Sequence, residues 1–278
     1  MESEAPYLVR SLSRQEAQVV AWLEAERHAT VTPDDVAEAL DWERPTIRKV
    51  LARLAEKGWL VRVAQGRYET VLAETGGFAL PNPWAALSLW QQPYYVGFQS
   101  AAYEHGLTPD RPGDVQACVA YGARRPRAWS EFPIALVWQR GFSRAGAGER
   151  DLHGFPVWIA SPEKLLVDGA ARPSRMGGLP GLLRVLDRAR EQADWRRVVE
   201  LAADVPRGRP ALKRLAHLVV LIGAEVAAPL DKAAAARPAE HPILLAEKRL
   251  YGGGGELDRR YGVIRNIDAN SLREEIRR

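Results

Sequence analysis

Residues 33–71 constrain the fold of this chain more than any other stretch. Their pattern predicts two helices joined by a tight turn and followed by a two-stranded hairpin. Pro45 lies near the start of the second helix, and Gly58 follows its last periodic residue, where helices commonly stop. The strand runs 59–63 and 67–71 are joined by a short link that ends in Gly66. This order of elements is the outline of a winged helix.

The second helix of this stretch has one apolar and one basic face. Its apolar side chains recur at helical spacing and predict a buried stripe of Ile47, Val50, Leu51 and Leu54. The opposite face carries residue types that reach phosphates and base edges from a major groove. The candidate DNA-binding residues on this helix are Arg44, Thr46, Arg48, Lys49 and Arg53. On the hairpin they are Arg62, Gln65 and Arg67, which we expect to touch a phosphate or enter a minor groove.

Positive charge is concentrated on this predicted reading surface. Residues 44–67 hold seven basic residues and one acid, a net charge of 7 − 1 = +6. Residues 1–72 together hold ten basic and twelve acidic residues, a net charge of −2. The coincidence of pattern, wing and charge favours DNA binding. Two alternatives stay open: a basic helix face can be merely solvated, and a winged helix can bind a protein instead.

Length and composition indicate a soluble globular protein with two domains. The chain has 278 residues, of which 46% are hydrophobic and 27% charged, and its net charge is only +4. Its one cysteine, Cys118, excludes an internal disulfide, and the apolar run around it predicts a buried thiol in a strand. No apolar run approaches the roughly 18 residues of a membrane span, and the N-terminus does not resemble a secretion signal. We therefore expect a cytoplasmic protein.

The chain is predicted to be an α+β protein with a winged helix-turn-helix at residues 1–72, a linker at 73–83 and a mixed α/β domain at 84–278. A capping box at Ser13 and Glu16 predicts a further helix over 11–28. Thr32 and Pro33 mark the start of the next helix. The Gly, Pro and Asn residues of the linker interrupt all periodicity.

The C-terminal domain is predicted to begin with helices and continue with strands. Helices are expected at 83–90 and 95–105, strands at 115–121, 134–139 and 156–160, and helices again at 179–189, 195–203 and 210–223. Ser161 and Pro162 predict the start of another helix. Residues 122–129 form a basic loop, residues 140–150 a mobile hairpin tip, and residues 243–250 and 260–267 a strand pair. An amphipathic helix is expected at the C-terminus.

The sequence contains no pattern typical of an enzyme, a cofactor site or a metal site. The glycine run 252–255 lacks the Gly-Lys-Ser/Thr ending of a phosphate-binding loop. The five histidines show no metal-binding spacing, and no Gly-x-Ser-x-Gly motif is present. None of the six lysines follows an acid by two positions, as a nuclease core commonly requires. We therefore expect no catalytic activity, no cofactor and no metal, although an enzyme of nucleic-acid metabolism stays a third hypothesis.

Four stretches of the C-terminal domain occur in an order that resembles the AbiEi-like antitoxin and transcriptional regulator family. They are YYVGFQSAAYEHGL at 94–107, PEKLLVDGAARPSRMGGLPGLLRVL at 162–186, RLAHLVVLIG at 214–223 and RRYGVIRNI at 259–267. Together with the winged helix they span nearly the whole chain. We interpret the characteristic residues of the first two stretches as fold determinants, with direct roles at a partner surface as the alternative. These residues are Tyr94, Tyr95, Gly97, Ser100, His105, Glu163 and Lys164.

The resemblance implies a repressor that binds operator DNA and autoregulates its operon. It also implies the antitoxin of a type IV toxin-antitoxin system, which counteracts a nucleotidyltransferase-like toxin encoded nearby. Family members without such a neighbour exist, so a ligand-sensing winged-helix regulator without a toxin partner is the alternative. A homodimer on DNA would match a two-fold symmetric operator, but no heptad pattern predicts one.

Overall fold

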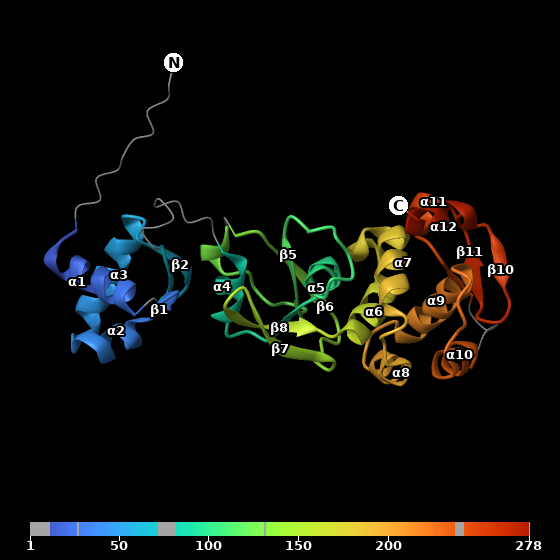
Figure 1. The fold of residues 1–278 in the computed structure, drawn as a ribbon, viewed down its shortest axis with the longest axis horizontal. Coiled ribbons are helices and arrows are strands. Elements are labelled where there is room, and N and C mark those ends of the chain that lie inside the picture. Colours follow the sequence, from blue (N-terminus) through green and yellow to red (C-terminus); the bar gives the residue numbers. More distant parts are fainter. Residues whose placement is uncertain (1–11, 27, 72–81, 131, 237–241, 278) are drawn as a thin grey trace, which may run out of the picture. The chain divides into compact units, whose positions relative to one another are not determined.

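The structure, a computed structural model, describes residues 12–26, 28–71, 82–130, 132–236 and 242–277 (Figure 1). The chain divides into two compact units, one of residues 1–91 and 125–133, the other of residues 92–124 and 134–278. This division differs from the predicted domains in two segments. Residues 84–91 and 125–133, both expected in the C-terminal domain, belong to the first unit. Residues 73–81 of the predicted linker lie outside the described residues.

The first unit has the predicted winged-helix order of elements. These are α1 (Arg14–Ala25), β1 (Thr30–Val31), α2 (Pro33–Leu40), α3 (Arg44–Glu56), β2 (Leu60–Ala64) and β3 (Arg67–Thr70). The strands form an antiparallel sheet in the order β1-β3-β2. Two further short elements follow, α4 (Pro83–Ser88) and the 3₁₀ helix η2 (Arg127–Trp129). The fold is therefore α+β, as the sequence predicts.

Local signals in the sequence fix where the helices of the first unit begin and end. Ser13 and Glu16 form the predicted capping box of α1, and Thr32 caps α2 in the same way. Pro33 occupies the first turn of α2. Asp41 ends α2 in the left-handed conformation at φ 52°, and Gly58 follows α3 at φ 73°. At Asp41 the chain turns sharply from α2 into α3.

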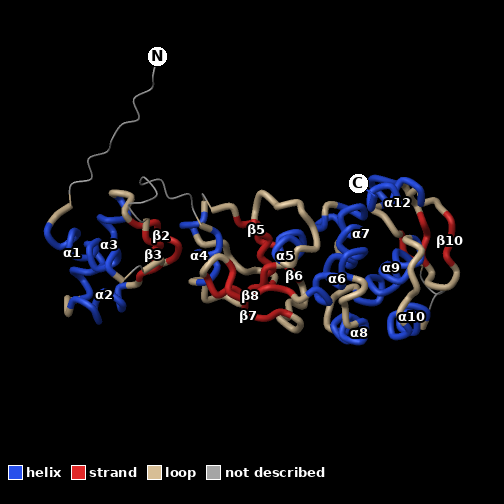
Figure 2. Tube along the Cα trace, viewed as in Figure 1, coloured by secondary structure: helices blue, strands red, loops and turns tan. Residues whose placement is uncertain are grey.

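The second unit is built on a mixed five-stranded sheet with the order β6-β5-β4-β8-β7 (Figure 2). Its strands are β4 (Tyr94–Val96), β5 (Val115–Ala120), β6 (Ile134–Gln139), β7 (Ala147–Leu152) and β8 (Phe155–Ala160). The pairs β5/β6 and β4/β8 are parallel, and β4/β5 and β7/β8 are antiparallel. Cys118 is fully buried in β5, which confirms the predicted buried thiol.

Two predictions for this sheet are wrong. Residues 95–97 are not helical, because β4 runs through Val96 and α5 (Phe98–Glu104) begins after Gly97. A side chain at Gly97 would meet the Cys118 sulfur at 2.7 Å, so this position needs glycine. The predicted mobile tip at 140–150 includes the first four of the six residues of β7, which pairs with β8 along its whole length. Because β7 is an exposed edge strand, it lacks the apolar alternation that would have revealed it.

Helices follow the sheet at the predicted places. They are α6 (Pro162–Ala171), α7 (Gly178–Ala189), α8 (Trp195–Ala203) and α9 (Gly208–Leu221), with the 3₁₀ helix η3 (Pro173–Met176) between the first two. Ser161 caps α6, as expected. The helix α10 (Ala228–Ala235) was not predicted. Its short alanine-rich sequence has only two buried residues, so its apolar period is weak.

The C-terminal part adds a small sheet in the order β10-β11-β9. Its elements are β9 (Ile243–Leu244), α11 (Lys248–Tyr251), β10 (Glu256–Asp258), β11 (Val263–Arg265) and α12 (Ala269–Arg277). The predicted strand at 243–250 is wrong beyond Leu244, because the chain turns into α11, but β9 does pair with β11.

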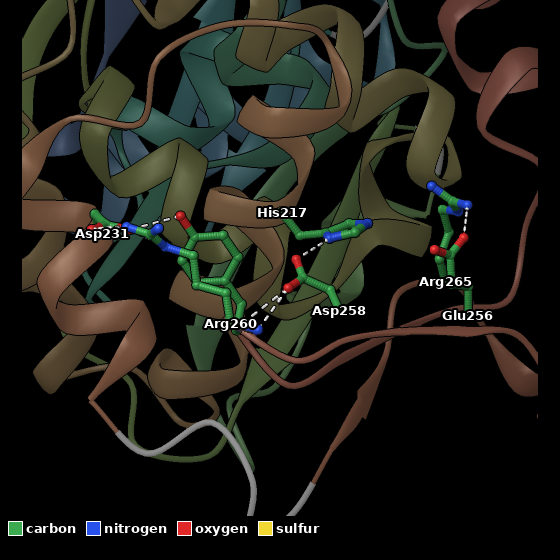
Figure 3. A network of polar contacts seen from close by, with 7 residues as sticks. His217, Asp231, Glu256, Asp258, Arg260 and Arg265 are labelled. Atoms are coloured by element: carbon green, nitrogen blue, oxygen red, sulfur yellow. Dashed lines mark hydrogen bonds and ion pairs between the residues drawn. The ribbon is translucent and has the colours of Figure 1, made fainter.

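Polar contacts tie this small sheet to the helices around it (Figure 3). The His217 imidazole of α9 lies 2.7 Å from an Asp258 carboxylate oxygen of β10. Arg260 donates two hydrogen bonds to Asp231 of α10. The C-terminal sheet is thereby attached to α9 and α10 by side-chain hydrogen bonds as well as by packing.

Candidate nucleic-acid interface

The apolar face of α3 fixes the direction in which its other face points. Ile47, Leu51 and Leu54 are completely buried and Val50 is nearly so. They join one core with Val19 and Leu23 of α1, Val36 of α2 and Tyr68 of β3. Burying side chains of this size contributes roughly 1.5–3 kcal/mol each. The helix therefore cannot rotate about its axis without exposing its core face.

The opposite face of α3 presents exposed cations. Arg48, Lys49 and Arg53 are all exposed, and Thr46 beside them is half-buried. Within the described part of the chain, none of these three cations forms a side-chain hydrogen bond or an ion pair with a carboxylate. Their charges are therefore available to an anionic partner such as a phosphate backbone.

Two other cations of the basic stretch have protein partners. Arg44 lies 2.8 Å from Asp34 of α2, but both side chains are more than 60% exposed, so this pair is weak and easily exchanged. Lys57 lies 2.6 Å from Glu16, whose side chain is only 1% exposed. The hydrogen bond from Lys57, with those from Ser13, holds the pKa of Glu16 at about 2. Lys57 is thus a structural residue, and the net charge of +6 overstates the charge that faces outward.

The wing is short, and its predicted DNA-binding residues differ in their contacts with the rest of the protein. Gln65 and Gly66 form the turn between β2 and β3, and Gly66 has a φ of 65°. Gln65 and Arg62 are exposed, and Arg62 donates a long hydrogen bond of 3.4 Å to the Ala64 carbonyl. Arg67 is half-buried and donates to the Leu89 carbonyl at 2.9 Å. Its role as a DNA-binding residue stays a prediction, but one of its N–H groups already binds the backbone just after α4.

A segment distant in sequence supports the wing. The indole N–H of Trp129, a fully buried residue of η2, donates to the Val63 carbonyl of β2 at 2.6 Å. Its ring contacts Trp90 edge-on, with 4.8 Å between ring centroids. Arg125, predicted to lie in an exposed basic loop, donates to the carbonyls of Trp129 and Phe132 and so braces this turn. Sequence reasoning missed this role, although an apolar Trp inside a basic loop is a signal for it.

One carboxyl group on the wing is held in an unfavourable environment. Glu69 of β3 is half-buried, and its Oε2 atom has no hydrogen-bond partner among the described residues. Burial raises the pKa of Glu69 to about 7, against the opposing effect of hydrogen bonds from Asn82. The wing strand therefore carries a group that changes its charge near neutral pH.

The characteristic residues of the second unit lie in its interior. The Tyr95 hydroxyl donates to Asp168 at 2.7 Å, and Lys164 lies 3.5 Å from the same carboxylate. The Ser100 hydroxyl accepts a hydrogen bond from the Gln116 amide. One nitrogen of His105 lies 2.7 Å from the Ala160 carbonyl. These contacts are what fold determinants would make. Glu163, whose carboxylate accepts from the Asp194 amide, lies nearer the surface.

Comparison with known sequences and structures shows what the two units resemble. Residues 11–67 match the MarR family profile. The winged helix of the first unit is therefore similar to the DNA-binding domain of MarR-family regulators, which supports a winged helix-turn-helix regulator. The match does not extend into the second unit, so it leaves the AbiEi resemblance as a hypothesis. No curated protein sequence matches the chain.

The whole fold occurs in at least one solved structure. The RV2827C protein from Mycobacterium tuberculosis has a similar crystal structure, with a TM-score of 0.72 at 20% sequence identity. The alignment covers 97% of each chain, so both units recur together. At this level of identity the likeness concerns the fold alone. None of the described helices is long and apolar enough to cross a membrane.

Proposed function

We propose that this protein is a sequence-specific repressor that places α3 in the major groove of its operator. Arg48, Lys49 and Arg53 would contact base edges and phosphates, and Arg62 and Gln65 would anchor the wing on the backbone. The supporting observation is the exposed face of α3. Its three cations have no partner among the described residues, while the neighbouring Lys57 is held by a buried carboxylate. Unpaired cations gathered on one exposed helix face match the charge of a phosphate backbone.

The test is binding of the full-length protein to the DNA upstream of its own gene, over a salt series and against unrelated competitor. Arg48→Ala, Lys49→Ala and Arg53→Ala should each weaken binding by about 1–3 kcal/mol if a base contact is lost. A phosphate contact alone should lower the salt slope by about one. Arg14→Ala, which removes an exposed charge from α1, is the matched control. Operator affinity unchanged by all three α3 substitutions would contradict the assignment of α3 as the reading helix.

We further propose that the protein is the antitoxin of a type IV system, which represses its own operon and counteracts a nucleotidyltransferase-like toxin. The support is the order of four family-like stretches through the second unit. These stretches belong to the second unit, where their characteristic residues form the interior, and not to α3. Repression and neutralisation would then depend on different units of the chain.

Co-expression in a bacterial host tests this second function. A toxic nucleotidyltransferase-like neighbour should stop growth when expressed alone, and the full chain should restore it. The Arg48→Ala/Arg53→Ala double variant should lose repression but still restore growth. No growth defect from any neighbouring gene, or no rescue by the full chain, would remove the antitoxin assignment and leave the repressor.

A ligand-sensing regulator without a toxin partner is the second candidate. The observation that favours it is a hollow of about 530 Å³ in the second unit, within the range of small-molecule sites. Release of the operator by a small molecule that binds this hollow would distinguish it from the antitoxin.

A further inference from the structure

The hollow in the second unit is lined by three segments that are distant in sequence. They are the end of α6 with η3, the first turns of α9, and β9 with the start of α11. Its volume of about 530 Å³ is enough for a ligand of nucleotide size. All lining residues belong to the second unit, so the site does not depend on the DNA-binding surface.

The charge of the lining is strongly positive. Arg172, Arg207, Arg214 and Lys248 line the hollow, against the single carboxylate of Glu247, which leaves a net charge of +3. Within the described ranges, none of these four cations lies within ion-pair distance of a carboxylate. Burial lowers the pKa of Arg214 to about 10, and the positive charge of Arg207 contributes to this shift. This excess of positive charge favours an anionic ligand.

The backbone at the start of α9 adds to this field. The helix has 14 residues, and no side chain caps its N-terminus. Pro210 and Arg214 of its first two turns form part of the wall, so the positive end of its dipole lies near the hollow. The start of α9 offers few donors, because Gly208 already donates its N–H to the Val205 carbonyl and Pro210 has no N–H. Arg207, the residue before the helix, has a φ of 69°, a conformation that non-glycine residues rarely adopt. Its side chain is exposed and lines the hollow.

The wall formed by β9 argues against an extended peptide as the ligand. This strand is an edge of the C-terminal sheet and would be free to accept another strand. However, Arg214 already donates to the carbonyls of Leu244 at 2.9 Å and Leu245 at 3.0 Å, and also to that of Ala170. A peptide strand would lose these acceptors. Ile243 and Leu244 instead contribute apolar atoms to the wall, which suit a compact molecule.

We propose that this hollow binds a small phosphorylated organic molecule. The phosphate would lie between the start of α9 and the side chains of Arg207 and Lys248, and the organic body would lie against β9. A phosphate monoester carries close to two negative charges and matches a net charge of +3 better than a single carboxylate does. This inference deepens the ligand-sensing candidate by naming the chemical class of its ligand.

Titration calorimetry of the full chain with adenosine 5′-monophosphate (AMP) tests the proposal. Ribose 5-phosphate has a smaller organic body than AMP, and inorganic phosphate has none. Adenosine lacks the phosphate, and benzoate carries a carboxylate in its place. We expect AMP or ribose 5-phosphate to bind and raise the melting temperature, inorganic phosphate to bind more weakly, and adenosine and benzoate not to bind. No binding of any phosphate at about 10 mM would overturn the proposal, because a specific site should be occupied at that concentration. Equal binding of adenosine or benzoate would overturn it as well.

Variants at the rim locate the site. Arg207→Gly removes the guanidinium and suits the positive φ, so the variant should fold. Combined with Lys248→Gln, it should weaken AMP binding at least about tenfold. Arg209→Ala removes an exposed charge from the same turn of α9 but does not line the hollow, and serves as the matched control. Equal affinity in the double variant and the control would overturn the proposal.

Two further measurements separate this site from the alternatives. An oligoglutamate peptide that binds the hollow while AMP does not would identify it as an acidic protein surface and overturn the small-ligand proposal. Arg48→Ala should weaken operator binding and leave AMP binding unchanged. Absence of AMP binding and absence of operator binding are thereby measured in separate experiments.

Discussion

The two parts of the predicted DNA surface differ in how their cations are used. On α3, Arg48, Lys49 and Arg53 project from a helix whose other face is fully buried, and none has a partner among the described residues. On the wing, Arg62 and Arg67 both donate to backbone carbonyls. Under the proposed function, α3 would supply the specific contacts with DNA, and the wing would have fewer donors to offer. Similar residue types in neighbouring elements therefore need not share a role.

The largest effect should come from removing the support of the wing. Trp129→Ala should destabilise the first unit by about 3–5 kcal/mol, because it empties a fully buried site and leaves the Val63 carbonyl without its donor. Calorimetry of the full chain measures the loss. Trp138→Ala is the control, since Trp138 is 48% exposed. If both variants lose equal stability, the segment around Trp129 does not hold the wing.

The comparison between α3 and the wing is sharpened by two arginine variants. Arg53→Ala should weaken operator binding by about 1–3 kcal/mol. Arg67→Ala should cost about 1 kcal/mol of stability, because the Leu89 carbonyl loses its donor, and weaken operator binding by less than about 0.5 kcal/mol. Fluorescence anisotropy with labelled operator measures the affinities. A larger affinity loss for Arg67→Ala than for Arg53→Ala would reverse the roles assigned to helix and wing.

A further effect concerns pH and should be confined to the wing. Since burial raises the pKa of Glu69 from 4.5 to about 7, the folded state retains a proton that the unfolded state loses. Stability should therefore fall as pH rises from about 4.5 to 7 and stay low above that. Glu69→Gln should stabilise the first unit by about 1–2 kcal/mol at pH 8 and have almost no effect at pH 4.

Hydrogen exchange locates this pH effect. The amides of β2 and β3 should become better protected in Glu69→Gln at pH 8, while those of α3 change less. A gain of the same size at pH 4 and pH 8 would mean that the charge of Glu69 is not its cause.

The first unit shows which features short-range signals can predict. The capping boxes of α1 and α2, the apolar stripe of α3 and the glycine turn of the wing each involve residues a few positions apart. Such features depend on backbone geometry and local hydrogen bonds, so they can be predicted from the sequence. The edge strand β7 was missed because its side chains are largely exposed, and β4 because its two sheet partners are distant in sequence.

The sequence by itself determined the winged helix, the basic face of α3 and the order of most helices and strands in the second unit. Only the tertiary structure decided which cations remain available. Lys57 meets Glu16 across 41 positions, and Trp129 reaches Val63 across 66. Four cations from three segments surround one hollow. The physical reason is that the energy of a charge depends on its neighbours in space and on its exposure to water, and neither follows from spacing along the chain.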